Sequence, residues 1–352
     1  MVVDKKRSLQ SLNHLPELRQ DLISGDWILL AKGRRLRPHE LQYTRITKAP
    51  PKSSCPFEDP QKSTNGPPLL WFGNPSRGAS AKGAAFKDWF LQIVRNKYPA
   101  VSYHMKKCPL LLRDGIYTKM SGMGFHEVII TRPHARSFSH LSIKEAELVV
   151  RAYQERILTL LKEKCLKYIL IFQNHGVEAG ASVFHPHSQL LALPIIPPDV
   201  GRSLDGARRF YHRHRKCVHC LMINQELKQK TRVVYKNKSF VVLAPYTSRT
   251  SFELRIFPLR HQARFETISA ADRVFCADAL IAALRKLYKG LKNPPYNFFI
   301  HTAPVERRHF EHYHWHIEIL PKTSKLAGVE LGTGIEIIAI SPEEAAAYLR
   351  KQ

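Results

Sequence analysis

The chain has 352 residues, 44% of them hydrophobic, and 55 Lys and Arg against 29 Asp and Glu give a formal net charge of +26. This length is sufficient for about two domains. No stretch reaches the roughly 18 consecutive apolar residues that a membrane-spanning helix needs, and the charged start from Met1 to Arg7 is not followed by the apolar segment of a secretory signal. These features argue against a membrane protein and predict a soluble, cytoplasmic one.

The basic residues are spread along the whole chain, as in Arg34-Arg35 and Arg208-Arg209. A positive field concentrates phosphorylated small molecules, but it is also typical of proteins that bind nucleic acid. A nucleic-acid-binding tail would gather its charge in one segment, and the chain has no aromatic stacking motif of the RNA-binding kind. The charge therefore favours an enzyme with phosphorylated substrates over a nucleic-acid-binding protein.

The cysteines are too few for a disulfide framework in a chain of this length. Cys217 and Cys220 form a C-x-x-C motif, which in a reducing compartment points to a metal rather than to a bridge; a pair of ordinary thiols is the alternative. All six are Cys55, Cys108, Cys165, Cys217, Cys220 and Cys276.

Taken in chain order, the predicted elements form an internal repeat. The first copy has a motif at Cys55 to Glu58, a loop over residues 59–85, and a strand over 125–131 that leads to Pro133-His134. A helix that starts near Glu145, a strand over 168–173 and a strand with paired histidines follow.

The second copy repeats this order after a polar, basic connector over residues 199–216. It has the Cys217 to Cys220 motif, a strand ending at Pro258, and a helix that starts near Asp272. A strand over 296–300 and a strand with His314 and His316 complete it. His134 and His185 are 51 residues apart and His261 and His314 are 53 apart, a match that chance rarely produces.

This alternation, without a glycine-rich dinucleotide fingerprint, predicts an α+β fold of two related antiparallel sheets flanked by helices. We expect the boundary at Pro197-Pro198. Residues 1–197 would then form the catalytic domain, and residues 198–352 a degenerate copy of it.

The run His185-Pro186-His187-Ser188-Gln189 carries the strongest signal for chemistry. Alternate residues of a strand share a face, so the side chains of His185, His187 and Gln189 point the same way. A neutral imidazole can attack phosphorus and later leave, and this divides a transfer into two steps. The Gln189 amide can donate to phosphoryl oxygens but cannot act as an acid. Paired histidines can also be core residues or metal ligands.

A small-residue loop precedes this strand, from Asn174 through Gly180 to Ser182. Small residues let the backbone approach a phosphate closely. The Ser182 hydroxyl could donate to the α-phosphate, and Asn174 could hold ribose or phosphate.

The run NHGVEAGASVFHPHSQLLALP, residues 174–194, resembles the active-site signature of the galactose-1-phosphate uridylyltransferase family in the histidine-triad superfamily. Plant ADP-glucose phosphorylases are also similar. The resemblance extends over nearly the whole chain. It includes the segments ELRQDLISGDWILLAKGRRLRP, VRNKYPA, GFHEVIITRPH, KCVHC, NPPYNFFIHTAP, HYHWHIEILP and GVELGTG.

The resemblance implies two histidine-triad-like subdomains and a ping-pong reaction in galactose metabolism. His187 would attack the α-phosphorus of UDP-glucose, a hexose 1-phosphate such as galactose 1-phosphate would accept the nucleotide, and Gln189 and Ser182 would stabilise the phosphoryl oxygens. A homodimer is also implied. The implied nucleotide and phosphate contacts are Asn174, Gly180, Asn96, Arg34 and Arg37, although the two arginines could equally lie at a solvated strand end.

The repeat and the resemblance together imply two structural zinc sites. Cys217, Cys220, His261 and His314 form a Cys₂His₂ set suited to tetrahedral zinc. The equivalent set in the first half is Cys55, Glu58, His134 and His185, with Glu58 where the family has a cysteine. It either holds a metal more weakly through this carboxylate, or leaves His185 held by hydrogen bonds.

The remaining histidines divide into two groups. His316 mirrors His187, but the second half lacks the small-residue loop, so with His301 it is expected to complete the substrate pocket or the dimer. His126, His175 and His219 are assigned to structure or surface. The alternatives to a uridylyltransferase are a phosphorylase of an ADP-sugar or dinucleoside polyphosphate, and, from another class, a zinc-stabilised nucleic-acid-binding protein.

Overall fold

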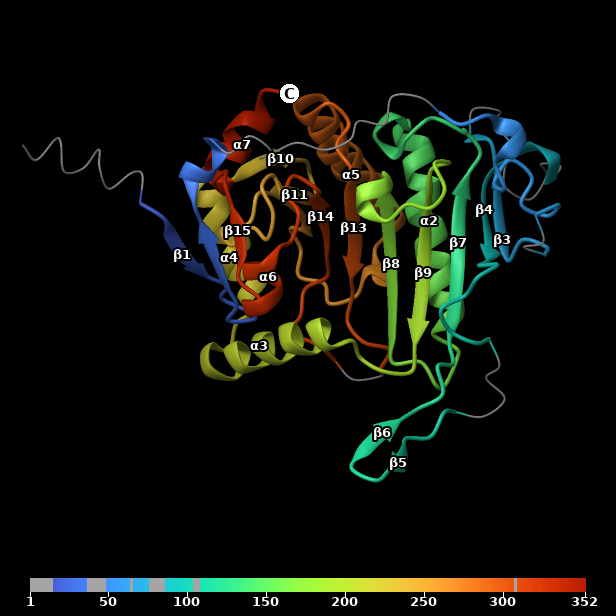
Figure 1. The fold of residues 1–352 in the computed structure, drawn as a ribbon, viewed down its shortest axis with the longest axis horizontal. Coiled ribbons are helices and arrows are strands. Elements are labelled where there is room, and N and C mark those ends of the chain that lie inside the picture. The colour runs from blue at the N-terminus through green and yellow to red at the C-terminus, as the bar shows by residue number, and fades with distance from the viewer. Residues whose placement is uncertain (1–14, 37–48, 64–65, 76–85, 104–107, 307–308) are drawn as a thin grey trace, which may run out of the picture.

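The structure is a computed structural model and describes residues 15–36, 49–63, 66–75, 86–103, 108–306 and 309–352. Within these ranges, one continuous antiparallel sheet of ten strands dominates the molecule, and each half of the chain contributes five adjacent strands (Figure 1). The first half provides, in sheet order, β3 (Leu70–Gly73), β4 (Trp89–Arg95), β7 (Phe125–Thr131), β9 (His187–Leu193) and β8 (Tyr168–His175). The second half continues with β13 (Tyr296–His301), β14 (His316–Pro321), β12 (Leu254–Pro258), β11 (Phe240–Leu243) and β10 (Val233–Lys236).

The two halves meet where β8 pairs with β13, with Phe172 opposite Phe299. The predicted α+β class and the antiparallel strands of each half are confirmed. The sequence analysis expected two sheets, and the pairing of β8 with β13 joins them into one. Each half thereby covers an edge strand that the other would otherwise expose.

Two long helices, α2 (Ile143–Leu160) and α5 (Ala270–Leu291), lie side by side on one face of this sheet (Figure 1). Each begins at a serine N-cap, since the side chains of Ser142 and Ser269 accept hydrogen bonds from the third residue of their helices. Apolar side chains from the helices and from strand residues such as Leu190 form the main core between the two layers. The opposite face of the sheet carries His187 of β9 and His316 of β14.

The N-terminal strands pack against the C-terminal end of the chain. β1 (Glu17–Gln20) and β2 (Trp27–Leu30) form a small sheet with β15 (Glu336–Ile338), in which β2 and β15 are parallel. The Arg19 guanidinium lies 3.1 Å from Glu343 in α7 (Pro342–Arg350). Residues 17–30 therefore pack against the C-terminal half of the chain, although the expected boundary at Pro197-Pro198 assigns them to the N-terminal domain.

Two loop predictions were wrong. Residues 199–216, expected as a connector, lie largely in the helix α3 (Pro198–His214), which α4 (Val218–Gln229) follows. Its apolar stripe includes the buried Leu204 and Ala207. Because this stripe lies within a strongly basic sequence, the sequence pattern did not indicate a helix. Residues 59–85 likewise contain β3.

A hairpin of β5 (Leu112–Asp114) and β6 (Tyr117–Lys119) projects from the lower edge of the molecule (Figure 1). Just before it, Cys108 forms a disulfide with Cys165. The sequence analysis expected cysteines in a reducing compartment and did not foresee this bridge; Cys55, Cys217, Cys220 and Cys276 are free. None of the described helices combines the length and apolar character that a membrane crossing requires.

Candidate active site

β9 divides its side chains between the two faces of the sheet. Leu190 faces the core beneath α2, where Tyr153 also donates a hydrogen bond to Ser188 over 2.8 Å. His187 and Gln189 face the side opposite the helices, where Phe57, Val128 and other apolar residues form a second cluster. The predicted nucleophile therefore stands on the face of the sheet that the long helices leave uncovered.

His187 is held in one tautomer by the backbone carbonyl two residues before it. Its Nδ1 lies 2.8 Å from the carbonyl oxygen of His185, so Nδ1 carries the proton and Nε2 carries the lone pair. The side chain is 5% exposed, and the Phe57 ring packs edge-on at 5.0 Å between centroids. Burial lowers the pKa of His187, although the bond to His185 opposes this, so the ring is neutral at pH 7. A neutral imidazole with a free Nε2 is the nucleophilic form.

Gln189 contacts a histidine that the sequence analysis placed outside the site. Its Oε1 lies 2.8 Å from Nε2 of His126, on the adjacent strand β7. The same Nε2 lies 3.2 Å from Nδ2 of Asn96, and Nδ1 of His126 accepts a hydrogen bond from the backbone N–H of Ala100 over 3.0 Å. Asn96 and Gln189, 93 positions apart in the sequence, are thus brought together by His126.

The small-residue loop is held by the other half of the molecule. Gly176 and Gly180 both have positive φ angles, 86° and 84°, which favour glycine. The Asn297 amide on β13 donates to Oδ1 of Asn174 and to the Ala179 carbonyl, each over 2.8 Å. Ser182 is exposed at the end of the loop. Asn174 therefore helps to shape the loop as well as lining it.

In the first candidate metal set, the ligand atoms of Cys55, His134 and His185 lie within 4.8 Å of one another, and Glu58 approaches both histidines. His134 and His185 each donate through Nε2 to a backbone carbonyl, of Pro50 and Thr131, so each Nδ1 is free to act as a ligand. The Nδ1 of His134 lies 3.0 Å from Oε1 of Glu58, yet both are buried atoms without a hydrogen-bond partner.

A contact between Cys55 and His185 completes this set. Cys55 Sγ lies 3.5 Å from Nδ1 of His185. Two facing lone pairs repel one another unless a cation lies between them, so the arrangement of Glu58 and His134 fits a metal. Cys55, Glu58, His134 and His185 could therefore hold one.

The second candidate metal set is more compact. The ligand atoms of its four residues all lie within 4.8 Å of one another, and Cys220 Sγ is 3.3 Å from Nδ1 of His261 and 3.5 Å from Nδ1 of His314. Hydrogen bonding with Cys220, and with His261 and His314, lowers the pKa of the Cys217 thiol, which favours the thiolate that binds zinc. Cys217, Cys220, His261 and His314 thus have the chemistry of a tetrahedral zinc site.

In the second half, β14 repeats the pattern of β9, but different side chains surround its histidine. His316 repeats the tie of His187, with Nδ1 3.1 Å from the His314 carbonyl, but its Nε2 lies 3.5 Å from a carboxylate oxygen of Glu318. Arg255 lies 3.1 Å from the same oxygen. His316 therefore faces a buried ion pair where His187 has a neutral amide nearby.

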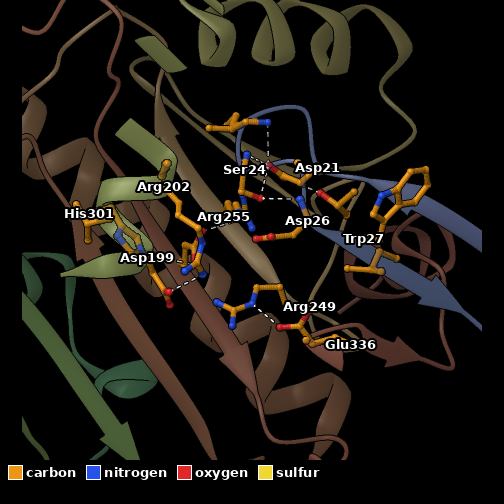
Figure 2. Close-up of a pocket in the computed structure, with 18 of the residues that line it drawn as sticks. Asp21, Ser24, Asp26, Trp27, Asp199, Arg202, Arg249, Arg255, His301 and Glu336 are labelled. Atoms are coloured by element: carbon orange, nitrogen blue, oxygen red, sulfur yellow. Dashed lines mark hydrogen bonds and ion pairs between the residues drawn. The ribbon is translucent and has the colours of Figure 1, made fainter. Parts of the chain in front are cut away.

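A pocket of about 570 Å³ opens at this second copy (Figure 2). Its walls come from the turn before β2, the start of α3 and strands β12 to β14. Among the lining residues, Arg202 pairs with Asp199 within α3, and Arg249 pairs with Glu336 of β15 (Figure 2). The volume favours a binding role for this face, but the pocket lining does not include His187.

Of the two arginines predicted as phosphate contacts, the described residues include Arg34. Arg34 lies in the short helix η1 (Lys32–Leu36), whose neighbour Arg35 pairs with Glu344 at the C-terminal end of the chain. No contact recorded among the described residues joins Arg34 to His187. Arg37 lies outside the described residues.

The sequence analysis missed His126 and Asn297 as contributors to the site. Strand alternation carried a signal for the first, because His126 is four residues before Ile130, which pairs with His187, and so shares its face. No comparable signal pointed to Asn297, which reaches the site only through the pairing of β8 with β13.

The chain is similar to known proteins in both sequence and fold. Residues 8–197 match the family of the galactose-1-phosphate uridyl transferase N-terminal domain. The chain is 32% identical to ADP-glucose phosphorylase of Arabidopsis thaliana, over 96% of this chain and 93% of that protein. It is 28% identical to galactose-1-phosphate uridylyltransferase of Thermotoga maritima, over 95% and 98%. A crystal structure of the Arabidopsis phosphorylase with bound ADP-glucose superposes with a TM-score of 0.79, covering 96% of this chain and 99% of that one at 30% identity.

Proposed function

Because this chain belongs to the galactose-1-phosphate uridylyltransferase family, we propose that it transfers a nucleotidyl group from a nucleoside-diphosphate hexose to a hexose 1-phosphate through a covalent intermediate on His187. The observation that carries the proposal is the tie between Nδ1 of His187 and the His185 carbonyl, which directs a free Nε2 lone pair away from the core. The expected donor is UDP-glucose, and the expected acceptor is galactose 1-phosphate.

In the first step, Nε2 of His187 forms a bond to the α-phosphorus, and the bond from that phosphorus to the bridging oxygen breaks. The hexose 1-phosphate leaves with the electron pair of this bond. The imidazole becomes positively charged, and the Nδ1–H bond to the His185 carbonyl stabilises that charge. The Gln189 amide and the Ser182 hydroxyl donate to the phosphoryl oxygens.

In the second step, a phosphate oxygen of the incoming hexose 1-phosphate attacks the same phosphorus, and the N–P bond breaks. Nε2 recovers its lone pair, so the enzyme is unchanged. Gln189 has no carboxylate that could serve as a general base for water, which favours a phosphate acceptor over hydrolysis. Asn96 and Asn174, with Gly180, line the nucleotide side of the site, with Arg34 and Arg37 as further candidates.

An ADP-glucose phosphorylase is the second candidate, favoured by the similarity to the Arabidopsis enzyme. In this reaction inorganic phosphate replaces hexose 1-phosphate as the acceptor, and ADP is released. Both reactions share the first step and the same His187 intermediate. They differ in the nucleobase that is bound near Asn96 and in the acceptor that attacks the phosphorus in the second step.

We further infer that the two metal sets hold structural zinc, which would tie His185 and His314 beside the strands that follow them. A cytoplasmic homodimer is part of the same proposal. The exposed apolar side chains of α6 (Gly328–Thr333), Val329 and Leu331, support a surface for a second copy.

The proposal is tested by incubating the protein with UDP-glucose or ADP-glucose without an acceptor and measuring its intact mass. We expect an increase equal to one nucleotidyl group with one of the two donors, mapped by peptide fragmentation to His187. The His187→Ala variant should gain no mass and lose turnover, while its melting temperature stays close to that of the wild type. His140→Ala, which changes an exposed histidine in η5 (Phe138–His140), is the matched control.

The acceptor then separates the two candidates. The labelled protein is mixed with galactose 1-phosphate or with inorganic phosphate, and release of the label is followed. An unlabelled protein with both donors, or full turnover by His187→Ala, would contradict the proposed intermediate.

A further inference from the structure

We propose that His126 is a positioning residue that orients the Gln189 amide and connects it to the segment Asn96 to Ala100. The inference rests on the proposed function, because it concerns the phosphoryl transfer at His187. It begins from the hydrogen-bond roles at His126, a side chain that is 9% exposed.

The tautomer of His126 is set by Ala100. The backbone N–H of Ala100 can only donate, so Nδ1 of His126, 3.0 Å away, must accept. A neutral imidazole has one proton, and it is therefore on Nε2. The backbone fixes this histidine in the tautomer opposite to that of His187, whose Nδ1 carries the proton.

The proton on Nε2 then orients Gln189. Two groups lie near this nitrogen, Nδ2 of Asn96 at 3.2 Å and Oε1 of Gln189 at 2.8 Å. Asn96 uses its Oδ1 to accept from the backbone of Tyr98 over 2.9 Å, so it presents its amino group to His126; that contact joins two donors and is not a hydrogen bond when Nε2 carries the proton. The Gln189 oxygen is the acceptor, and its NH₂ group is left to donate to the phosphoryl oxygens.

A reversed Gln189 amide would place two donors against each other and leave its oxygen toward the phosphate. It would then repel the charge that develops there instead of stabilising it. The bond from His126 removes this orientation, and such preorganisation is how a hydrogen-bond donor lowers a barrier. Because Asn96 and Ala100 contact the same ring, the segment expected to hold the nucleoside is physically linked to the amide.

The second half supports this reading by contrast. The repeat aligns His126 with Glu253 and Gln189 with Glu318, so two carboxylates replace the histidine and the amide. Arg255 bridges them, 2.8 Å from Glu253 and 3.1 Å from Glu318. The His126–Gln189 pair therefore occurs in the half that carries His187 and is absent from its structural copy.

Two substitutions of similar polarity separate the contacts of His126. His126→Asn places an amide near the Nδ1 position, where its oxygen can accept from Ala100, but it loses the donor to Gln189. His126→Gln reaches the Nε2 position and keeps a donor for Gln189, but loses the Ala100 contact. His140→Asn is the control for the same exchange on a histidine far from Gln189 in the fold.

The measurement is the single-turnover rate of His187 labelling by the active donor, with kcat and KM in the full reaction. We expect His126→Asn to lower the labelling rate and kcat roughly 10- to 100-fold, less than the roughly 100- to 1000-fold cost of removing a preorganised donor, because the amide is still present but no longer held in one orientation, with KM changed less than threefold. His126→Gln should retain most of the rate. In the Gln189→Ala background, His126→Asn should have no further effect, because the amide that it orients is gone.

Melting temperatures show whether each variant is folded, and the comparison between Asn and Gln holds even when both are less stable than the wild type. Equal losses for the two substitutions, or a full additional loss in the Gln189→Ala background, would overturn the positioning role. If the wild type is labelled normally and only these comparisons fail, the proposed function stands without this inference. If no donor labels the wild type, both fall.

Discussion

At the scale of residues, His187 and His316 have the same backbone tie and different neighbours. Each donates from Nδ1 to the carbonyl of the histidine two positions earlier. The Nε2 of His316 faces the Glu318 carboxylate. Burial raises the pKa of Glu318, but the charges of Arg255 and His301 and the hydrogen bonds from His301 and His316 together outweigh burial and keep the pKa well below its ordinary value, so the carboxylate is ionised. A fixed negative charge at that place repels phosphate, which supports the proposed assignment of the nucleophile to His187 rather than to His316.

This contrast predicts the effect of Gln189→Glu. The substitution gives the first half the carboxylate of the second, removes an N–H donor and adds a negative charge beside the phosphoryl group. We expect the rate of His187 labelling to fall by at least about 100-fold, as in the removal of an oxyanion donor, while the melting temperature changes by a few degrees at most. Rapid-quench measurement of the labelled protein tests this. A rate within threefold of the wild type would show that Gln189 does not contact the phosphoryl oxygens.

At the scale of elements, a capping box at Ser142 begins α2, the helix that packs on the sheet behind the site. The Ser142 hydroxyl accepts from the backbone of Glu145 over 3.3 Å, and the Glu145 carboxylate accepts from the backbone of Ser142 over 2.8 Å. Burial raises the pKa of Glu145, but hydrogen bonds from Ser142 and Arg136 outweigh it and keep the pKa below its ordinary value. The capping box is therefore complete at neutral pH.

Ser142→Ala should lower the free energy of unfolding by about 1 kcal/mol, the usual cost of an N-cap hydroxyl, since the N–H of Glu145 loses its partner. Ser142→Thr keeps the hydroxyl and should retain most of that stability. Chemical denaturation of the two variants and the wild type measures the difference. Equal destabilisation by Ala and Thr would mean that packing at this position, rather than the cap, is responsible.

The elements also show where prediction from sequence succeeded and where it failed. The strands around residues 125–131 and 168–173 and the starts of α2 and α5 were predicted, because apolar runs and acidic residues in the first turn of a helix are local signals. The helix α3 was read as a connector, because its apolar stripe is narrow within a basic sequence. His126 was read as structural, because only the pairing of β7 with β9 brings it to Gln189.

At the scale of the whole molecule, the metal sets join segments that are far apart in the sequence. The first connects Cys55 and Glu58 to His134 and His185, and the second connects α4 to the start of β14. A structural metal supplies folding free energy directly, so ligand loss should weaken the tertiary structure as well as the metal content.

We expect Cys220→Ser to lose one zinc per chain and to melt at a lower temperature than the wild type.

Glu58→Cys should strengthen zinc binding at the first set. A second thiolate replaces a harder carboxylate ligand, so zinc loss to a chelator should be slower than in the wild type. Metal content after dialysis against EDTA, measured by mass spectrometry, tests both. An unchanged zinc count in Cys220→Ser would remove the second set from the proposal, and Cys276→Ser, at a buried free cysteine outside both sets, is the control.

By itself, the sequence determined the repeated order of elements, the candidate residues for attack on phosphorus and for metal binding, and the approximate starts of the two long helices. These depend on side-chain chemistry and on periodicity within one segment. Only the tertiary structure decided that the two sheets join at β8 and β13, that residues 17–30 pair with residues 336–338, and that Gln189 meets His126. Strand pairing between distant segments is set by burial and backbone hydrogen bonding across the whole molecule, and no local pattern records which edges will meet.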